Sequence, residues 1–279
     1  MAQQPTGLVP QSAAAISIEE TKLMLFVGPG DSGKSYAATS FGLRTKEYGG
    51  KDSRPCYMIE LDGRIAALRN RPVMYNSFTN EDGVTKVLHR IEELREQCVK
   101  NKVAPFHTLI VDSTTSFGDL AVAESMETKG SAGRSIGKLE LLTVEVYGFE
   151  AEAFRQLLWE SLMDIKKYCD VIVTAHQTEL YKTAATKPGA PTRQEWDGKS
   201  YKILMHGNKI ANKLPTKFDE IYEFANKELI VSSSSMRRSV RFQGHLARTS
   251  YPQLAKNTAD HDISGKEFYT YWKSLLEKV

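Results

Sequence analysis

Short apolar runs alternate with amphipathic segments along much of the chain. Residues 23–27, 56–59, 109–111 and 171–175 are mainly apolar or β-branched, and runs this short are typical of strands that are buried on both faces. Between such runs, apolar residues recur at three- and four-residue steps, as in residues 84–98, which predicts helices packed on the sheet. The pattern therefore predicts an α/β fold with a mostly parallel central sheet and helices on both faces.

The C-terminal part of the chain has a different pattern. Residues 218–224 alternate as a strand does, and residues 229–231 and 239–242 fit two more strands, which predicts an antiparallel extension. Residues 264–267 read Ser-Gly-Lys-Glu, a capping-box pattern, and a helical apolar stripe follows them. We expect this stripe to pack on the core rather than to bind a partner.

These patterns divide the chain into three parts. Residues 1–20 are rich in Gln, Pro, Ala and Ser and are expected to form a mobile tail; the alternative is an added edge strand in which Ile16 and Ile18 alternate. Residues 21–260 are expected to form the core, and residues 261–279 a C-terminal amphipathic helix packed on it. A chain of 279 residues with 41% hydrophobic content is long enough for one large α/β domain.

A glycine-rich segment follows the first apolar run. Residues 28–35 read Gly-Pro-Gly-Asp-Ser-Gly-Lys-Ser, which fits G-x-x-x-x-G-K-[ST], and residues 36–41 are compatible with a helix. Glycines let consecutive backbone N–H groups approach phosphate oxygens, and the start of the next helix carries partial positive charge. The alternative is that the glycines merely form a turn. The eight-residue match between a strand and a helix favours a nucleotide site.

The residue types in this segment indicate a nucleoside triphosphate and Mg²⁺ as cofactors, and ATP is the nucleotide expected. Lys34 supplies a mobile positive charge for the β and γ phosphates, and the Ser35 hydroxyl is suited to bind Mg²⁺. The expected nucleotide-binding residues are Gly28, Pro29, Gly30, Asp31, Ser32, Gly33, Lys34, Ser35 and Tyr36.

Polar residues end three of the other predicted strands, where a parallel α/β sheet binds its ligands. Asp112 ends one run and is expected to hold Mg²⁺ or its water. Glu60 and Asp62 follow another and are candidates for orienting the water that attacks the γ-phosphate; the alternative is a plain solvated strand end. His176 and Gln177 follow the last run and are expected to sense the γ-phosphate; the alternative is that the histidine caps the strand.

Positive charge is concentrated late in the chain. The net charge is only +3, which alone implies no polyanionic partner. Residues 182–217, however, contain eight Lys or Arg against two acidic residues, and residues 231–256 contain five against none. The basic excess therefore lies in the last hundred residues.

Two segments with basic residues are candidates for binding single-stranded DNA. Residues 124–147 contain several Gly and Ser and are expected to include a flexible basic loop. Residues 181–201 are expected to form a long irregular loop, in which Trp196 and Tyr201 lie among basic residues. Basic side chains with aromatic rings suit single strands, because charge follows the backbone and rings stack on bases; the alternative is a solvated loop. The basic candidates are Lys129, Arg134, Lys138, Lys182, Lys187, Arg193 and Lys199.

The cysteines and the hydropathy pattern predict a cytoplasmic protein. Cys56, Cys98 and Cys169 are isolated and odd in number, so neither a disulfide framework nor a zinc site is expected. No apolar run approaches about 18 residues, so we expect no signal peptide and no membrane partner.

The order of four motifs resembles that of the RecA-like core ATPases. The motifs GPGDSGKS, IELDG, LIVDS and VTAHQTE occupy residues 28–35, 59–63, 109–113 and 173–179. The closest likeness is to bacteriophage nucleotide-binding proteins that include single-strand annealing and recombination ATPases, and it covers about residues 21–256. It implies a RecA-like P-loop NTPase core, Mg²⁺-dependent ATP hydrolysis, and single-stranded DNA as a partner.

The resemblance also implies roles for particular residues. In RecA-type recombinases a carboxylate just past the second strand activates the hydrolytic water, and Asp62 matches that place, although those recombinases usually have Glu there. The γ-phosphate sensor matches Gln177 or His176. The two loops that line single-stranded DNA would correspond to about residues 128–139 and 181–201.

Self-assembly is a further implication of this resemblance. A homo-oligomeric filament or ring is expected, in which a basic residue of one subunit completes the site of the next. The local candidates are Arg237, Arg238, Arg241, Arg248 and Lys256, and Arg248 and Lys256 are the residues expected to act in this way. Two alternatives remain: a helicase or loader motor in DNA replication, and a nucleotide-gated assembly protein with slow turnover that binds another phage protein. A phage-encoded chain would work in the bacterial host cytoplasm.

Overall fold

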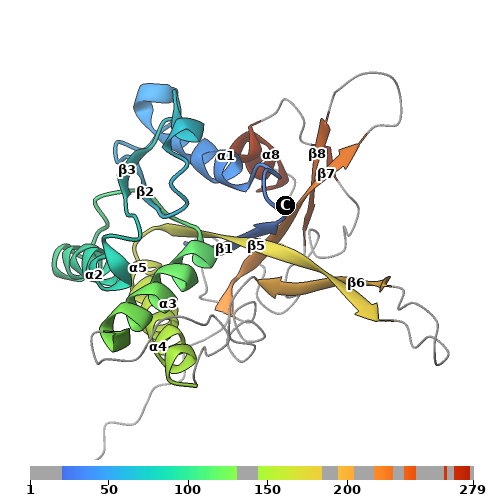
Figure 1. Ribbon diagram of the computed structural model, residues 1–279. Coiled ribbons are helices and arrows are strands. Elements are labelled where there is room, and N and C mark those ends of the chain that lie inside the picture. The colour runs from blue at the N-terminus through green and yellow to red at the C-terminus, as the bar shows by residue number, and fades with distance from the viewer. Residues whose placement is uncertain are drawn as a thin grey trace, which may run out of the picture.

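The computed structural model describes residues 21–130, 144–183, 194–203, 217–228, 236–242, 261–262 and 267–276. Its centre is a twisted sheet with the strand order β3-β2-β4-β5-β1-β7-β8-β9, and β6 pairs with β5 outside this path (Figure 1). Six neighbouring strands run parallel: β3 (Met74–Ser77), β2 (Cys56–Glu60), β4 (Thr108–Asp112), β5 (Asp170–Thr183), β1 (Leu23–Gly28) and β7 (Glu220–Glu228). The predicted mostly parallel sheet is thus confirmed.

The remaining strands are antiparallel. Strand β8 (Met236–Phe242) pairs with β7, and the short β9 (His261–Asp262) pairs with β8. Strand β6 (Gln194–Ile203) pairs with the second half of β5. The predicted antiparallel C-terminal extension is therefore present.

The sheet is buried on both faces, as its continuous apolar strands require. In β1 the side chains of Leu23 and Leu25 belong to one core cluster, and those of Met24 and Phe26 belong to another on the opposite face. All four are inaccessible to solvent. Alternate residues of one strand therefore hold helices on both sides of the sheet.

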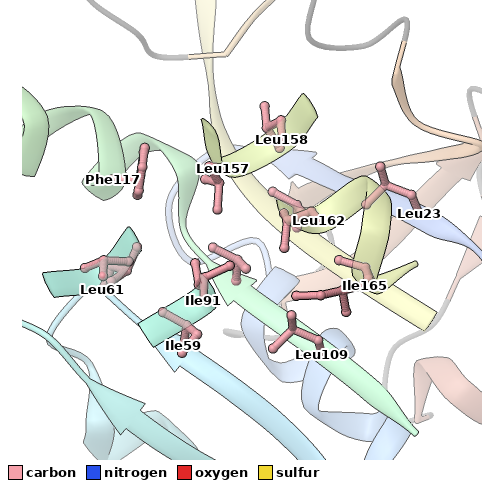
Figure 2. Close-up of a cluster of buried hydrophobic side chains, with 14 of the residues drawn as sticks. Leu23, Ile59, Leu61, Ile91, Leu109, Phe117, Leu157, Leu158, Leu162 and Ile165 are labelled. Atoms are coloured by element: carbon pink, nitrogen blue, oxygen red, sulfur yellow. The ribbon is translucent and has the colours of Figure 1, made fainter. Parts of the chain in front are cut away.

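The first face is covered by helices from the middle of the chain. Helix α2 (Gly83–Asn101) packs against α3 (Thr114–Gly130), and α3 packs against α4 (Val144–Phe154). Helix α4 continues through the π-helical η5 (Arg155–Leu162) into α5 (Met163–Ile165), and both of these also contact α2. Figure 2 shows how their apolar side chains meet those of the strands. The predicted periodicity of residues 84–98 is confirmed, because every one of the buried residues of α2 lies on it.

The opposite face is covered by elements from the two ends of the described chain. Helix α1 (Lys34–Thr39) and the short helices η2 (Ser40–Arg44), η3 (Lys46–Tyr48) and η4 (Ile65–Leu68) lie on the same side as α8 (Phe268–Leu276) (Figure 1). Phe268 and Trp272 of α8 are buried against Phe41. The apolar stripe of the last helix therefore packs on the core.

Two predicted loops are partly regular structure. The segment 124–130 is the end of α3, where Glu124 accepts a hydrogen bond of 2.9 Å from the Thr85 N–H, and α4 begins before Tyr147. The segment 181–201 is not one irregular loop, because β5 extends to Thr183 and β6 begins at Gln194. Aromatic and β-branched residues favour strands here, and Gly198 is accommodated within β6. The prolines that suggested a loop lie outside the described residues.

Other predictions also fall outside the described residues. These are the N-terminal tail, the strand at 229–231, and the basic residues Arg134, Lys138, Lys187, Arg193, Arg248 and Lys256. In the described part of the chain, no helix combines the length and the apolar character that crossing a bilayer requires.

Candidate functional site

The glycine-rich segment forms a tight turn between β1 and α1. A side chain could not replace the hydrogen of Gly28, because a Cβ atom there would lie 2.3 Å from the Phe224 carbonyl oxygen. Gly33, the N-cap of α1, has a φ of 91°, a left-handed value that glycine adopts at little cost. Asp31 also has a positive φ, of 58°. The chain thus curls closely around the start of α1, as a phosphate-binding loop does.

Lys34 reaches back across this turn. Its Nζ atom donates hydrogen bonds to the Gly28 carbonyl at 3.0 Å and to the Pro29 carbonyl at 2.7 Å. The side chain is buried, and burial lowers the pKa of the amine to about 8, although the nearby carboxylates of Asp112 and Asp62 oppose this change. A phosphate group at this loop would stabilise the charged amine.

Asp112 lies at the end of β4, where the predicted metal-binding carboxylate was expected. The Thr174 hydroxyl of β5 donates a hydrogen bond to Asp112 Oδ1, and the Ser35 side chain also hydrogen-bonds this carboxylate. Burial raises the pKa of Asp112 to about 6, and the negative charge of Asp62 contributes to that rise. The structure thus brings together Ser35 and Asp112, the two residues expected to hold Mg²⁺.

This pair fits a magnesium ion by its chemistry. A hydroxyl and a carboxylate are oxygen ligands, and Mg²⁺ is commonly bound through one or two carboxylates together with substrate phosphates and water. In the described ranges there is no cluster of three or more His, Cys, Asp or Glu that could hold a metal by itself. A shared site between protein and phosphate needs no such cluster.

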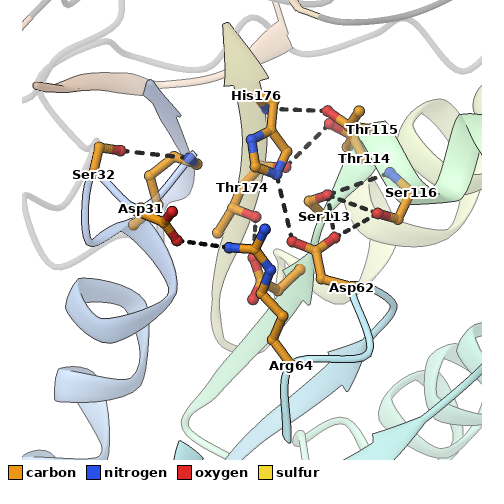
Figure 3. Close-up of polar contacts among 12 residues, drawn as sticks. Asp31, Ser32, Asp62, Arg64, Ser113, Thr114, Thr115, Ser116, Thr174 and His176 are labelled. Atoms are coloured by element: carbon orange, nitrogen blue, oxygen red, sulfur yellow. Dashed lines mark hydrogen bonds and ion pairs between the residues drawn. The ribbon is translucent and has the colours of Figure 1, made fainter. Parts of the chain in front are cut away.

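Asp62 lies in the loop that follows β2, and three side chains contact its carboxylate (Figure 3). Its carboxylate accepts hydrogen bonds from Ser113 Oγ at 2.7 Å and Ser116 Oγ at 2.5 Å, and His176 Nε2 lies 3.5 Å from Oδ2. Burial alone would raise the pKa of Asp62, but these hydrogen bonds outweigh it and lower the pKa to about 2. Asp62 therefore remains a carboxylate at neutral pH.

Glu60 is placed differently from Asp62. It is only 1% exposed, and its two oxygens accept hydrogen bonds from the Arg64 N–H at 2.9 Å and from Ser77 Oγ at 2.7 Å. Arg64 belongs to the loop after β2, and Ser77 is the last residue of β3. Glu60 thus fixes this loop, whereas Asp62 contacts the ends of β4 and β5.

His176 marks the point where β5 leaves the parallel sheet. Its backbone N–H donates to Thr115 Oγ1 at 3.0 Å, and its ring faces Asp62. Up to this residue β5 pairs with β1, and from Gln177 onward it pairs with β6. The backbone of Gln177 is described, while its side chain lies outside what the structure describes.

The strand order explains why these residues meet. β5 lies between β1 and β4, and β2 lies on the other side of β4, so the carboxyl ends of β1, β4 and β2 form one row with the part of β5 near His176. A cavity of about 220 Å³ lies along this row. Its lining includes Asp31, Gly33, Lys34, Ser35, Tyr36, Glu60, Asp62, Arg64, Asp112 and His176.

Several residues at the site were not predicted from the sequence. Ser113 and Ser116 hold Asp62, and Thr174 holds Asp112. Arg64 lines the cavity, and the Arg71 guanidinium lies 3.8 Å from the centre of the Tyr36 ring. Ser113 and Thr174 lie at the predicted strand ends, which was the available signal, and Ser116 lies three residues further, in α3. Nothing in the sequence pattern marks Arg71, because its contact depends on how η4 packs against α1.

Comparison with known proteins agrees with this geometry. A family model described as an AAA domain matches residues 20–250, which is most of the chain. The chain belongs to the AAA domain family. The match spans the phosphate loop and every residue of the cavity lining, and it supports a P-loop AAA-type ATPase that binds nucleotide, generally with Mg²⁺. No curated protein shows a significant match to the chain.

Proposed function

We propose that this AAA-domain protein hydrolyses ATP with Mg²⁺ and uses the nucleotide to control its binding to single-stranded DNA, in phage-type recombination or strand annealing. The observation that carries the proposal is the contact between Asp62 and His176, with a 3.5 Å distance between Oδ2 and Nε2. It joins the carboxylate best placed to orient water to the residue from which the β5–β6 hairpin begins.

Phosphate binding rests on the buried Lys34 and on the backbone of the loop. The Lys34 amine, now hydrogen-bonded to the Gly28 and Pro29 carbonyls, is positioned to bind phosphate oxygens as a point charge. Ser35 and Asp112 would hold Mg²⁺, which when bound neutralises charge on the phosphates. The protein's part in such a reaction is mainly positioning and electrostatic stabilisation.

Asp62 is proposed to orient the attacking water. Its three partners, Ser113, Ser116 and His176, fix the carboxylate beside the metal-binding end of β4. With a pKa of about 2 it is a weak base, so it acts by holding the water in line more than by removing its proton. Glu60 is a weaker candidate, because its partners are Arg64 and Ser77, whereas Asp62 contacts residues that follow Asp112 and the residue that ends the β1 pairing of β5.

The β5–β6 hairpin is proposed to carry the nucleic-acid surface. It extends from the sheet edge where the nucleotide would bind (Figure 1). Lys182 and Lys199 lie on its two strands, and Tyr181 pairs with Trp196 in the register. Basic and aromatic residues on one hairpin suit a single strand. Loss of the γ-phosphate would shift His176 and, through β5, this hairpin.

Lys129, whose backbone lies near the end of α3, is proposed as a further residue that binds nucleic acid. The oligomer is proposed to be a homo-oligomeric filament or ring, with Arg248 or Lys256 reaching the neighbouring subunit's nucleotide. Replication or recombination proteins of a phage would be the further partners.

One observation favours a second candidate function. The low pKa of Asp62 and its short side chain favour slow hydrolysis. In this second function, ATP binding would control assembly with another protein, and the protein would not bind DNA. A helicase or loader motor has no such specific support.

Steady-state ATP hydrolysis, measured with and without a single-stranded oligonucleotide at low and moderate salt, separates these functions. Stimulation by the oligonucleotide that fades with salt is the expected result, because phosphate contacts release counterions. A rate of hydrolysis that the oligonucleotide does not change at either salt concentration would contradict the DNA proposal and favour the assembly protein. A wild-type protein that binds no nucleotide would overturn both.

A further inference from the structure

The loop after β2 places one arginine at the mouth of the cavity. Arg64 follows Asp62 by two residues, and its backbone N–H donates to Glu60 Oε1 at 2.9 Å. Glu60 is itself buried and anchored by Ser77 Oγ at 2.7 Å. The start of the Arg64 side chain therefore has a fixed position beside the site.

The side chain of Arg64 then reaches Asp31 of the phosphate loop (Figure 3). Its Nη1 atom donates to Asp31 Oδ1 at 2.8 Å. Both residues line the cavity together with Lys34, Ser35 and Asp112. Burial is the main reason for the lowered pKa of Lys34, and the positive charge of Arg64 also lowers it, which places the guanidinium within electrostatic reach of the phosphate-binding amine.

Arg64 can exchange its present partner, Asp31, for a phosphate group. The side chains of Arg64 and Asp31 are 58% and 86% exposed, and ion pairs so open to solvent contribute little to stability. A phosphate group offers a guanidinium two parallel charge-assisted hydrogen bonds and more negative charge. A triphosphate in the cavity therefore competes well against Asp31 for this arginine.

We propose that Arg64 is a cis-acting ligand of the terminal phosphate of a nucleoside triphosphate, held by Asp31 until the nucleotide binds. This inference rests on the proposed function and adds to it a residue that distinguishes triphosphate from diphosphate. Glu60 then has the role of a positioning residue, since it fixes the backbone from which Arg64 reaches. Asp31 has the role of a competing partner.

The test compares affinities for a non-hydrolysable ATP analogue and for ADP, each with Mg²⁺, by titration calorimetry. Arg64→Ala should weaken binding of the analogue by about tenfold or more, because a charge-assisted phosphate contact is lost, and should leave ADP affinity within about twofold. Arg64→Lys should recover only part of the loss, since a point charge cannot bind two oxygens in parallel. Asp31→Asn should tighten binding of the analogue.

Arg69→Ala is the matched control. Arg69 is an exposed arginine close by in the chain that does not line the cavity, so its removal should change neither affinity. Unchanged analogue affinity in Arg64→Ala, or an equal loss for analogue and ADP, would overturn the inference while the wild-type protein still binds nucleotide. Failure of the wild type to bind either nucleotide would overturn the proposed function as well.

Discussion

Ser113 Oγ donates a hydrogen bond of 2.7 Å to Asp62 Oδ1, which ties the loop after β2 to the residue that follows Asp112. The water-orienting candidate and the metal-binding candidate are thereby held in one unit, although 50 residues separate them in the chain. Glu60 lies just before Asp62 but faces Arg64 and Ser77 instead. The two carboxylates of this loop therefore have separable roles.

Substitution of each carboxylate should separate these roles. Asp62→Asn should lower the ATP turnover number by about a hundredfold or more, since the charge that orients water is lost, with nucleotide affinity changed only a few-fold. Glu60→Gln keeps one carbonyl oxygen and should retain most turnover, while the lost hydrogen bond lowers the free energy of unfolding by about 1–3 kcal/mol. Single-turnover kinetics and urea unfolding measure the two effects.

The opposite result would assign the water-orienting role to Glu60 instead of Asp62. If Glu60→Gln abolished turnover in a folded protein while Asp62→Asn remained active, Glu60 would be the water-orienting residue. Asp62→Glu provides the matched control, because it keeps the charge with a longer side chain.

Much of this site could be predicted from the sequence because its parts are short and local. The strand, glycine loop and helix that contain Gly33 and Lys34 are consecutive, and Asp112 ends a run whose burial follows from its apolar residues. The choice between Asp62 and Glu60 could not be made, since it depends on which neighbouring strand each side chain faces.

The outer part of the molecule was predicted less well. Gly and Pro residues near 181–201 suggested an irregular loop, but the two ends of that segment pair with each other as β5 and β6. Pairing between strands is a non-local interaction, and it overrides the weak local preference of single glycines such as Gly198. In the same way, the ion pair between Arg71 and Glu267 joins residues that no local pattern connects.

Replacing Gly28 should lower the stability of the fold. In Gly28→Ala the new Cβ would lie 2.3 Å from the Phe224 carbonyl oxygen, so β1 and β7 must move apart, at a cost of about 1–3 kcal/mol. Gly30→Ala is the matched control within the same loop, because a Cβ there meets nothing within 4 Å. Thermal unfolding should show a lower melting temperature for the first variant and an unchanged one for the second. Equal melting temperatures would show that the close contact is absent in solution.

The hairpin prediction can be tested by removing charge from it. Replacing Lys182, Lys187, Arg193 and Lys199 with Ala should weaken binding to a single-stranded oligonucleotide and flatten its salt dependence, since fewer phosphate contacts release fewer counterions. Nucleotide affinity should not change. Fluorescence anisotropy over a range of salt concentrations measures the first effect, and calorimetry with ADP measures the second.

A control with the same change of charge is available. Lys51, Lys86, Lys100 and Lys167 are exposed and lie outside both basic segments, so replacing these four with Ala removes equal charge from other surfaces. This variant should bind the oligonucleotide nearly as the wild type does. Equal weakening in both variants would point to a nonspecific effect of net charge and remove the hairpin from the interface.

His107 should make the stability of the protein depend on pH. It is 1% exposed, its Nδ1 lies 2.8 Å from Thr108 Oγ1, and its Nε2 has no hydrogen-bond partner among the described residues. Burial lowers the pKa of His107 to about 4, and the positive charge of Arg44 contributes. Between its ordinary pKa of 6.5 and this value, the unfolded chain binds a proton that the folded protein does not. Stability should therefore fall as the pH falls from about 6.5 toward 4, by at most about 1.4 kcal/mol per pH unit from this group.

Urea unfolding of wild type and His107→Gln at pH 7, 6 and 5 measures this contribution. The variant is expected to be less stable at pH 7 but to lose less stability between pH 6.5 and 5, because the substituted side chain does not titrate. His89→Gln changes an exposed histidine on α2 and should keep the wild-type dependence on pH. If His107→Gln also kept that dependence, another buried group would be responsible for the loss. A flatter curve in His107→Gln alone would identify the histidine next to β4 as the group that limits stability in mild acid.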